Sequence, residues 1–236
     1  MLIIAHRGAS GDFPENTLPA FAGAIAAGAA MCELDVHLSR DGVPIVIHDD
    51  RVDRTTDGCG AVSELTLAEI RTLDAGVRFA PGFAGTRVPS LEEVIELCAG
   101  RCALNVELKD AAAVDATCAA MRAGGMLEQG LISSFQWPVL HAVRRLQPAI
   151  GIGVLADRAP AAMLAQALSL GAVAIHPSYP LADAALCARA HAHGLRVYAW
   201  TVDSPALAER LQARGVDGVM TNYPARMAAL GVPAED

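Results

Sequence analysis

The sequence lacks several features that would place the chain in a membrane or outside the cell. No apolar run reaches the roughly 18 residues needed to cross a bilayer. Met1 leads directly into the apolar residues 2–5, without the basic, apolar and cleavage regions of a signal peptide. The six cysteines include no C-x-x-C pair, so Cys98 and Cys102 are expected to be core thiols and not zinc ligands. We therefore expect a cytoplasmic protein without stable membrane insertion.

Charged and aromatic side chains are also scarce. Asp, Glu, Lys and Arg make up 19% of the residues, aromatic residues make up 4%, and the net charge is −8. This balance argues against a nucleic-acid partner, which normally needs a basic face. It does not exclude a small phosphate-bearing ligand, because one cation and two basic side chains can dominate a cleft locally. The 53% of hydrophobic residues fit Ala-rich helices packed on aliphatic strands.

Short apolar runs alternate with helical segments along the chain, which is typical of β/α units. Eight such units in 236 residues predict a closed (β/α)8 barrel, or TIM barrel. An open doubly wound sheet is the alternative, but no G-x-G-x-x-G follows the first strand as in its dinucleotide-binding form. We treat a further apolar run at 44–48 as an extension near the second strand. The eight expected strands are residues 2–5, 32–38, 103–109, 131–134, 151–155, 173–176, 196–200 and 218–221.

Residues 49–89 interrupt this alternation. Thr, Asp, Gly and Pro recur there, and only residues 65–73 have helical periodicity. Long irregular stretches in compact domains are usually functional. We interpret the segment as a short loop insertion over the site, within a single catalytic domain that spans residues 1–236.

The second expected strand is unusually acidic. Alternation sends Glu33, Asp35 and His37 to one face and apolar residues to the other. The two carboxylates lie about 7 Å apart on such a strand. Two acids directed into one space repel each other unless one is protonated or a cation lies between them. This face therefore predicts a metal site.

The third expected strand repeats the pattern, with Asn105, Glu107 and Lys109 on one face. Neighbouring strands are about 4.8 Å apart, so Glu107 is able to approach Glu33 and Asp35. Three carboxylates without clustered thiols favour one hard cation, Mg²⁺ or Ca²⁺, over zinc. Polar residues also follow the other strands where barrel enzymes build their sites, among them His6, Arg7 and His48.

Short polar motifs follow one another in order along the chain: HRG at 6–8, ENT at 15–17, ELD at 33–35, DG-x-P to HD at 41–49, RTTDG at 54–58, PSLEE at 89–93, ELK at 107–109 and WTV at 200–202. In order and spacing they resemble the glycerophosphodiester phosphodiesterase family. The resemblance covers essentially the whole chain. It implies a (β/α)8 barrel that hydrolyses phosphodiesters of glycerol 3-phosphate with one divalent ion. The expected partner is thus a small glycerophosphodiester substrate.

The resemblance also implies roles for individual residues. The metal ligands would be Glu33, Asp35 and Glu107. His6 and His48 would be the catalytic acid and base, with the order between them open. The phosphate would be held by Arg7 and Lys109, although Lys109 could instead simply pair with Glu107 or Asp110.

Other positions have an assigned role and a simpler alternative. Trp200 either stacks on the substrate or packs in the core. Glu15 is expected to orient Arg7, and Asn16 either supports the site or caps a helix. Asp49, next to His48, is a further supporting residue. His37 is expected to lie outside the group of direct metal ligands, and His176 is expected to line or cap the mouth of the barrel. Three further histidines are expected to be solvated on helix surfaces, namely His141, His191 and His193.

The chain departs from the family pattern after its last strand. The family often has a Thr-Asp-x-Pro pattern there, and this chain has Thr221-Asn222-Tyr223-Pro224. The asparagine keeps a hydrogen-bond acceptor and loses a charge. Any ionic role at that position is therefore in question.

Three alternatives remain open from the sequence. The first is a lysophospholipase D-type phosphodiesterase, which would need an apolar rim; Phe79, Phe83 and Phe135 are the candidates. A non-catalytic glycerophosphodiester-binding barrel is the second, but binding needs no acid and base. The third is an unrelated barrel metalloenzyme such as a sugar isomerase, in which the HRG and ENT motifs have no evident use.

Overall fold

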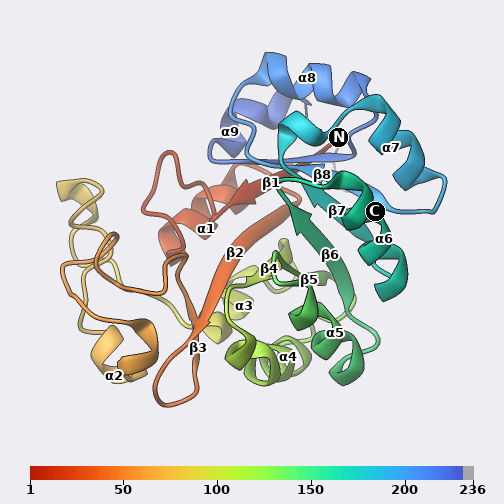
Figure 1. Cartoon of the computed structure of the whole chain (residues 1–236). Coiled ribbons are helices and arrows are strands. Elements are labelled where there is room, and N and C mark those ends of the chain that lie inside the picture. The colour runs from red at the N-terminus through yellow and green to blue at the C-terminus, as the bar shows by residue number, and fades with distance from the viewer. Residues whose placement is uncertain (231–236) are drawn as a thin grey trace.

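The computed structural model describes residues 1–230, and within them eight parallel strands close into a barrel (Figure 1). In this described part of the chain the sheet has nine strands; one of them, β3, is antiparallel, and the pairing of β1 with β2 closes the other eight. The prediction of a (β/α)8 barrel is confirmed. Around the barrel the order is β1 (Leu2–His6), β2 (Met31–Leu38), β4 (Ala103–Leu108), β5 (Gly130–Ser134), β6 (Gly151–Ala156), β7 (Ala174–Pro177), β8 (Arg196–Ala199) and β9 (Gly218–Thr221).

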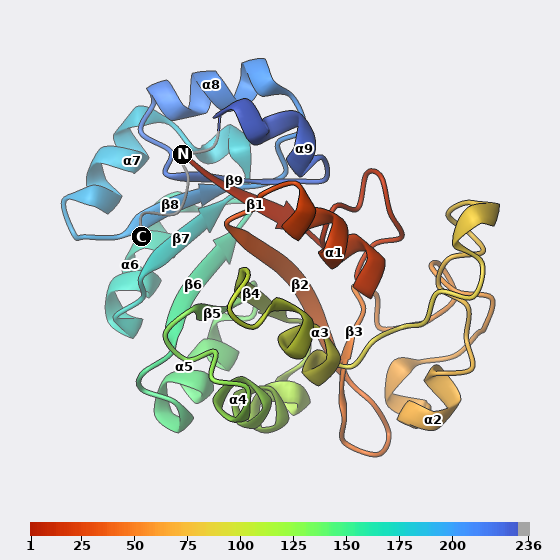
Figure 2. The same ribbon diagram turned by 180° about the vertical axis from the view of Figure 1, so that it is seen from behind.

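Helices cover the outside of the barrel (Figure 2). Leu34 and Leu104, which point outward from β2 and β4, belong to one large buried cluster that also contains helix residues such as Leu91 and Val94. Across residues 1–230, each helix is too short or too polar to span a bilayer. The helices are α1 (Leu18–Ala26), α3 (Leu91–Cys98), α4 (Val114–Ala123), α5 (Trp137–Leu146), α6 (Pro160–Leu170), α7 (Ala184–His191), α8 (Pro205–Ala213) and α9 (Pro224–Met227).

The strand β3 (Pro44–Val46) forms a hairpin with β2 outside the barrel. We expected an extension near the second strand; the structure shows an antiparallel return, with Val36 opposite Val46. The Ile47 N–H donates to the Asp35 carbonyl over 3.0 Å. Because the chain folds back in this way, His48 comes to lie beside the acidic strand.

The segment 49–89 protrudes to one side of the barrel in both ribbon views (Figures 1 and 2). It has a small core of its own, made of Val52, Val62, Ile70, Ala75 and Val88 together with two β3-region residues, Ile45 and Ile47. The predicted helix at 65–73 is shorter in the structure. There, α2 (Leu67–Ile70) is one turn that begins at a capping box between Thr66 and Glu69.

Two further expectations need correction. The helix expected at 181–193 begins only at Ala184, because the Asp183 side chain accepts the Leu186 N–H and caps it there, and it ends at His191; His193 lies in the following turn. His176 does not line the mouth. Its ring is fully buried against Tyr198, with ring centroids 5.4 Å apart, and burial lowers its pKa to about 3.

The predicted domain extends to residue 236, and its last six residues lie outside the described part of the chain. Within residues 1–230 the barrel, its helices and the inserted segment are continuous in sequence. That these elements form one catalytic domain remains a prediction.

Candidate active site

Three buried carboxylates meet at the mouth of the barrel because of the register between β2 and β4. Asp35 lies opposite Glu107, and Glu33, two residues earlier on the same face of β2, lies opposite Asn105. The exposed fractions are 3% for Glu33, 1% for Asp35 and 7% for Glu107. One oxygen from each of the three lies within 4.8 Å of the others. The structure therefore brings together the three predicted metal ligands.

Two cationic side chains lie against this acidic triad. The Lys109 ammonium is 3.0 Å from Asp35 Oδ1 and also donates to Glu107 Oε1. Arg7 Nε is 3.3 Å from Asp35 Oδ2. Lys109 therefore forms the ion pair with Glu107 that was the simpler alternative to phosphate binding. It also forms a second ion pair, with Asp35.

The three carboxyl groups differ in pKa because both cations, Arg7 and Lys109, contact Asp35 directly. Burial alone would raise the pKa of Asp35, but Lys109 and Arg7 outweigh it and hold the pKa at about 2. Burial and the nearby Asp35 charge raise the pKa of Glu107 to about 7 and that of Glu33 well above its usual range. Asp35 is thus the stabilised anion of the triad, and Glu33 the destabilised one.

His6, the last residue of β1, lies beside the triad. Its Nδ1 is 2.7 Å from Asn222 Oδ1, and its Nε2 is 4.0 Å from Glu33 Oε2. Burial and the nearby Arg7 charge lower the pKa of His6. The ring therefore favours the neutral form, with one nitrogen bound to an amide and the other facing the acids.

His48 approaches the mouth from the β3 side. Its Nδ1 lies 2.7 Å from Asp49 Oδ1, so this histidine has a carboxylate partner where His6 has an amide. His37 Nε2 lies 3.1 Å from the His48 carbonyl oxygen. His37 thus holds the backbone of His48, which agrees with its predicted place outside the direct ligands.

Arg54, from the inserted segment, connects the two sides of the mouth. Its guanidinium donates to both oxygens of Glu15, at 2.8 and 2.9 Å, and to both oxygens of Asp49, at 2.6 and 3.0 Å. Glu15 accepts from Arg7 over 3.0 Å, and Asp49 contacts His48. The Arg54 hydrogen bonds lower the pKa of Asp49. The sequence motif contained Arg54, but the sequence did not reveal this role.

Asn16 contacts the triad directly instead of capping α1. Its Nδ2 donates to Asp35 Oδ2 over 2.8 Å, and the N-cap position belongs to Thr17. Asn16 and Arg7 both have left-handed backbone, with φ of 57° and 56°, which is uncommon for residues other than glycine. This conformation directs the Arg7 N–H to Glu33 Oε2 at 2.9 Å.

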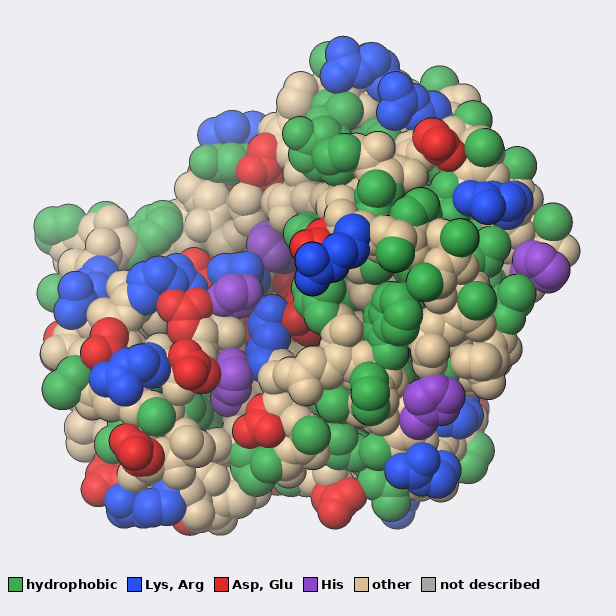
Figure 3. Space-filling model, viewed as in Figure 1, with side chains coloured by type: hydrophobic (Ala, Val, Ile, Leu, Met, Phe, Trp, Pro, Cys, Tyr) green, Lys and Arg blue, Asp and Glu red, His purple; other side chains and the backbone are tan. Residues whose placement is uncertain are grey.

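The mouth holds a cavity of about 80 Å³. Figure 3 shows histidine, basic and acidic side chains gathered where the inserted segment meets the barrel. Trp200 is half-buried at the rim, with its indole N–H bound to the His176 carbonyl and its ring edge-to-face with Phe135. The lining includes the two catalytic candidates, two of the acids, both cations and the aromatic pair: His6, His48, Glu33, Glu107, Arg7, Lys109, Phe135 and Trp200.

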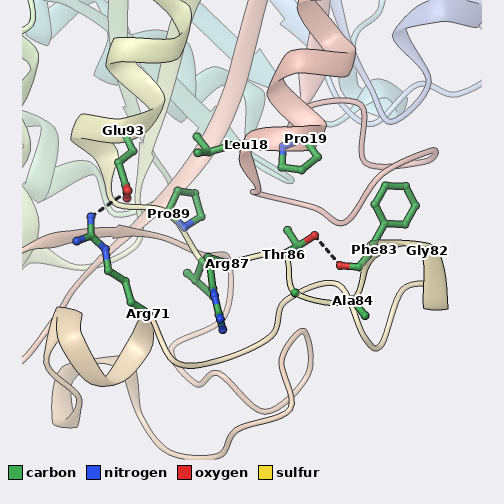
Figure 4. Close-up of a pocket in the computed structure, with 12 residues that line it drawn as sticks. Leu18, Pro19, Arg71, Gly82, Phe83, Ala84, Thr86, Arg87, Pro89 and Glu93 are labelled. Atoms are coloured by element: carbon green, nitrogen blue, oxygen red, sulfur yellow. Dashed lines mark hydrogen bonds and ion pairs between the residues drawn. The ribbon is translucent and has the colours of Figure 1, made fainter.

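A larger cavity of about 760 Å³ lies elsewhere, between the start of α1, the inserted segment and the start of α3 (Figure 4). Its charged side chains have local partners: Arg71 pairs with Glu93 at 2.9 Å, and Arg87 donates to the Thr72 carbonyl at 2.9 Å. The acidic triad and the histidines do not line it. The larger cavity and the cluster of acidic, basic and histidine side chains are therefore at different places, and we take the cluster at the mouth as the candidate active site.

A polar, triad-bearing mouth on a (β/α)8 barrel is typical of barrel enzymes. Residues 6–226 match the glycerophosphoryl diester phosphodiesterase family. The chain is 39% identical over 229 residues to the glycerophosphodiester phosphodiesterase of Caldanaerobacter subterraneus subsp. tengcongensis, covering 94% of both chains.

Two solved structures share the fold. A phosphodiesterase from Oleispira antarctica, in complex with the product sn-glycerol-3-phosphate, is 32% identical with a TM-score of 0.91, over 98% of this chain and 97% of that one. A glycerophosphodiester phosphodiesterase from Agrobacterium tumefaciens is 30% identical with a TM-score of 0.87, over 97% and 99%. The chain belongs to the glycerophosphodiester phosphodiesterase family. The predictions of this family and of an enzyme are confirmed.

The uneven pKa values predict opposite effects of two similar substitutions on the metal-free protein. Asp35→Asn leaves Lys109 and Arg7 buried beside a neutral group, so it should lower the free energy of unfolding by about 3 kcal/mol or more. Glu33→Gln removes the carboxylate with the raised pKa and should increase stability at pH 7. Urea unfolding in the presence of a chelator measures both. Equal changes in the two variants would contradict this electrostatic description.

A second prediction concerns Arg54. Arg54→Gln should release both Glu15 and Asp49, so that Arg7 and His48 lose their fixed orientation. Misplaced reacting groups cost up to about 10²-fold in rate, and we expect a loss of that order in kcat. Arg40→Gln is the control, because Arg40 pairs with Glu69 in an exposed contact at 3.0 Å. Equal activities for the two variants would show that Arg54 does not support the site.

Proposed function

We propose that this protein hydrolyses glycerophosphodiesters to sn-glycerol 3-phosphate and an alcohol, with one divalent ion, Mg²⁺ or Ca²⁺. The observation that carries the proposal is the buried acidic triad with two cations and two histidines at one mouth. Family membership supports the reaction class. The Oleispira antarctica relative, solved with sn-glycerol-3-phosphate, supports the product. The assay for this product after incubation with several glycerophosphodiesters tests the proposal; release of inorganic phosphate or phosphocholine instead would contradict it.

The donor set fits a hard divalent ion. All three predicted ligands offer carboxylate oxygens, which Mg²⁺ and Ca²⁺ prefer. Oxygens within 4.8 Å of one another suit ligands of one ion, whose metal–oxygen distances are about 2.0–2.6 Å. Glu33, Asp35 and Glu107 would hold the ion. Bound there, it would supply positive charge to the phosphate oxygens.

Arg7 and Lys109 would bind the phosphate. A phosphodiester carries one negative charge, and charge on its oxygens must be neutralised as the phosphorus becomes five-coordinate. Both side chains are largely buried beside Asp35, and both line the cavity. Buried cations in fixed positions stabilise such charge better than solvated ones, because they need no reorientation during the reaction.

His6 and His48 would move the two protons that the reaction needs. One histidine takes a proton from the attacking hydroxyl, and the other gives a proton to the leaving alkoxide. The family resemblance implies that the glycerol 2-hydroxyl attacks first and forms a cyclic phosphate, which water then opens. Both rings line the same cavity, which is where such transfers require them.

Lysophospholipids are a second candidate substrate class, favoured by one observation. Phe135 is 42% exposed and lies against Trp200 at the mouth, so an apolar surface adjoins the polar cavity. Phe79 is equally exposed in the inserted segment, whereas Phe83 is half-buried. Parallel assays with glycerophosphocholine and lysophosphatidylcholine, with and without Phe135→Ser, distinguish the two classes.

The proposed function as a glycerophosphodiester phosphodiesterase also includes a cytoplasmic location.

Metal removal should abolish turnover. Chelation is expected to stop hydrolysis, and added Mg²⁺ or Ca²⁺ to restore it. Asp35→Ala should lose metal binding in a calorimetric titration while the barrel keeps its circular-dichroism spectrum. Full activity after chelation would contradict the metal site.

Replacing either His6 or His48 with alanine should lower kcat by about 10²- to 10⁴-fold, the usual contribution of general acid or base catalysis. KM should change far less in His6→Ala and His48→Ala, because Arg7 and Lys109 still bind the phosphate. A p-nitrophenyl ester, whose leaving group departs without a proton, should rescue the variant that lacks the acid and not the one that lacks the base. Equal losses on both substrates would rule out this division of roles.

A further inference from the structure

Asn222, the residue at which the chain departs from the family pattern, has hydrogen-bond partners at both ends of its side-chain amide. Its side-chain Nδ2 donates to Asp203 Oδ2 over 2.8 Å, and its backbone N–H donates to Asp203 Oδ1 over 2.8 Å. The Thr221 hydroxyl donates to the same Oδ1 over 3.0 Å. On its other side, Asn222 Oδ1 lies 2.7 Å from His6 Nδ1 and 2.9 Å from the Ser10 hydroxyl, whose one hydrogen is shared with the His6 carbonyl oxygen at 2.7 Å.

These contacts determine which way the amide points. A carboxylate only accepts hydrogen bonds, so the amide must present its NH₂ end to Asp203. Its oxygen then faces His6. An amide oxygen also only accepts, so His6 Nδ1 must carry the hydrogen. In the neutral ring, Nε2 is left without a hydrogen, and it is this nitrogen that faces Glu33 and the cavity.

We propose that Asp203 and Asn222 are positioning residues that fix the ring orientation and the Nδ1–H tautomer of His6. The inference rests on the proposed function, in which His6 transfers a proton. The Nδ1–H tautomer leaves its Nε2 unprotonated on the side of the cavity. Asp203 lies in the loop after β8 and Asn222 directly after β9. Because β9 lies between β8 and β1 in the barrel, the two loops meet at the end of β1, where His6 lies.

In this arrangement an amide stands where the family often has the acid of a Thr-Asp-x-Pro pattern. The negative charge is retained at the site, but it lies one hydrogen bond farther from the ring, on Asp203. His6 is therefore oriented by a neutral amide, whereas His48 contacts a carboxylate directly. The two histidines are held by chemically different partners.

An exchange of the two residues tests the proposal. Asp203→Asn alone removes the group that determines the amide direction, and Asn222→Asp alone places two carboxylates against each other. Each should lower kcat by about 10- to 100-fold, the usual cost of losing such a supporting partner. The double variant Asp203→Asn/Asn222→Asp again pairs an amide donor at 203 with an acceptor at 222 that faces His6. It should recover kcat to within a few-fold of the wild type, with KM nearly constant throughout.

The tautomer itself is measured without substrate, by ¹⁵N NMR of histidine-labelled protein. We expect an Nδ1–H signal for His6 in the wild type and the double variant, and a mixture with the Nε2–H form in Asp203→Asn. Asp183→Asn is the matched control, since the Asp183 carboxylate only caps α7, and it should change neither the tautomer nor kcat.

An unchanged His6 tautomer in Asp203→Asn would overturn the proposal, as would a double variant no better than the worse single variant. A lower melting temperature with an unchanged tautomer would show that Asp203 only ties two loops together, and this would also overturn it. If the wild-type protein hydrolysed no glycerophosphodiester, the proposed function would fail, but the NMR result would still decide whether Asp203 sets the His6 tautomer.

Discussion

The register between β2 and β4 brings Asp35 against Glu107 in the interior of the barrel mouth, with Glu33 on the same face. Buried carboxylates repel one another strongly, and their burial is tolerated only with compensating positive charge. Arg7 and Lys109 provide part of that charge, and both concentrate on Asp35. Glu33 and Glu107 are left with raised pKa values. A further positive charge at the triad would stabilise the ionised forms of these two carboxyl groups.

The remaining polar groups of the mouth keep these charges in place. Arg54 binds two carboxylates, one of which holds Arg7 and the other His48. On the opposite side Asp203 holds the amide that contacts His6. Arg7, His48 and His6 are therefore each held by a side chain that is itself fixed by a further charged residue. Such outer contacts commonly decide how well a reactive side chain is oriented.

The acidic triad was accessible from the sequence because strand alternation has a period of two and parallel strands pair side by side. Glu33, Asp35 and Glu107 could be assigned to one face without any coordinates. The contacts of Arg54 and Asp203 could not be predicted in this way. Their partners lie on loops that come together only when the barrel closes. Local sequence periodicity does not predict which loops will be in contact. For the same reason the burial of His176 against Tyr198 was missed, since the layers of the barrel interior depend on the register of all eight strands.

The inserted segment has a hydrophobic core that is separate from that of the barrel, and His48 follows the strand that contributes to this smaller core. Small cooperative units open at a lower free energy than the whole fold. Opening of this one would remove His48, Asp49 and Arg54 from the mouth while the eight-stranded barrel stayed intact. We therefore expect the temperature range in which the enzyme works to be bounded by this small core, with heat inactivation before most of the chain unfolds.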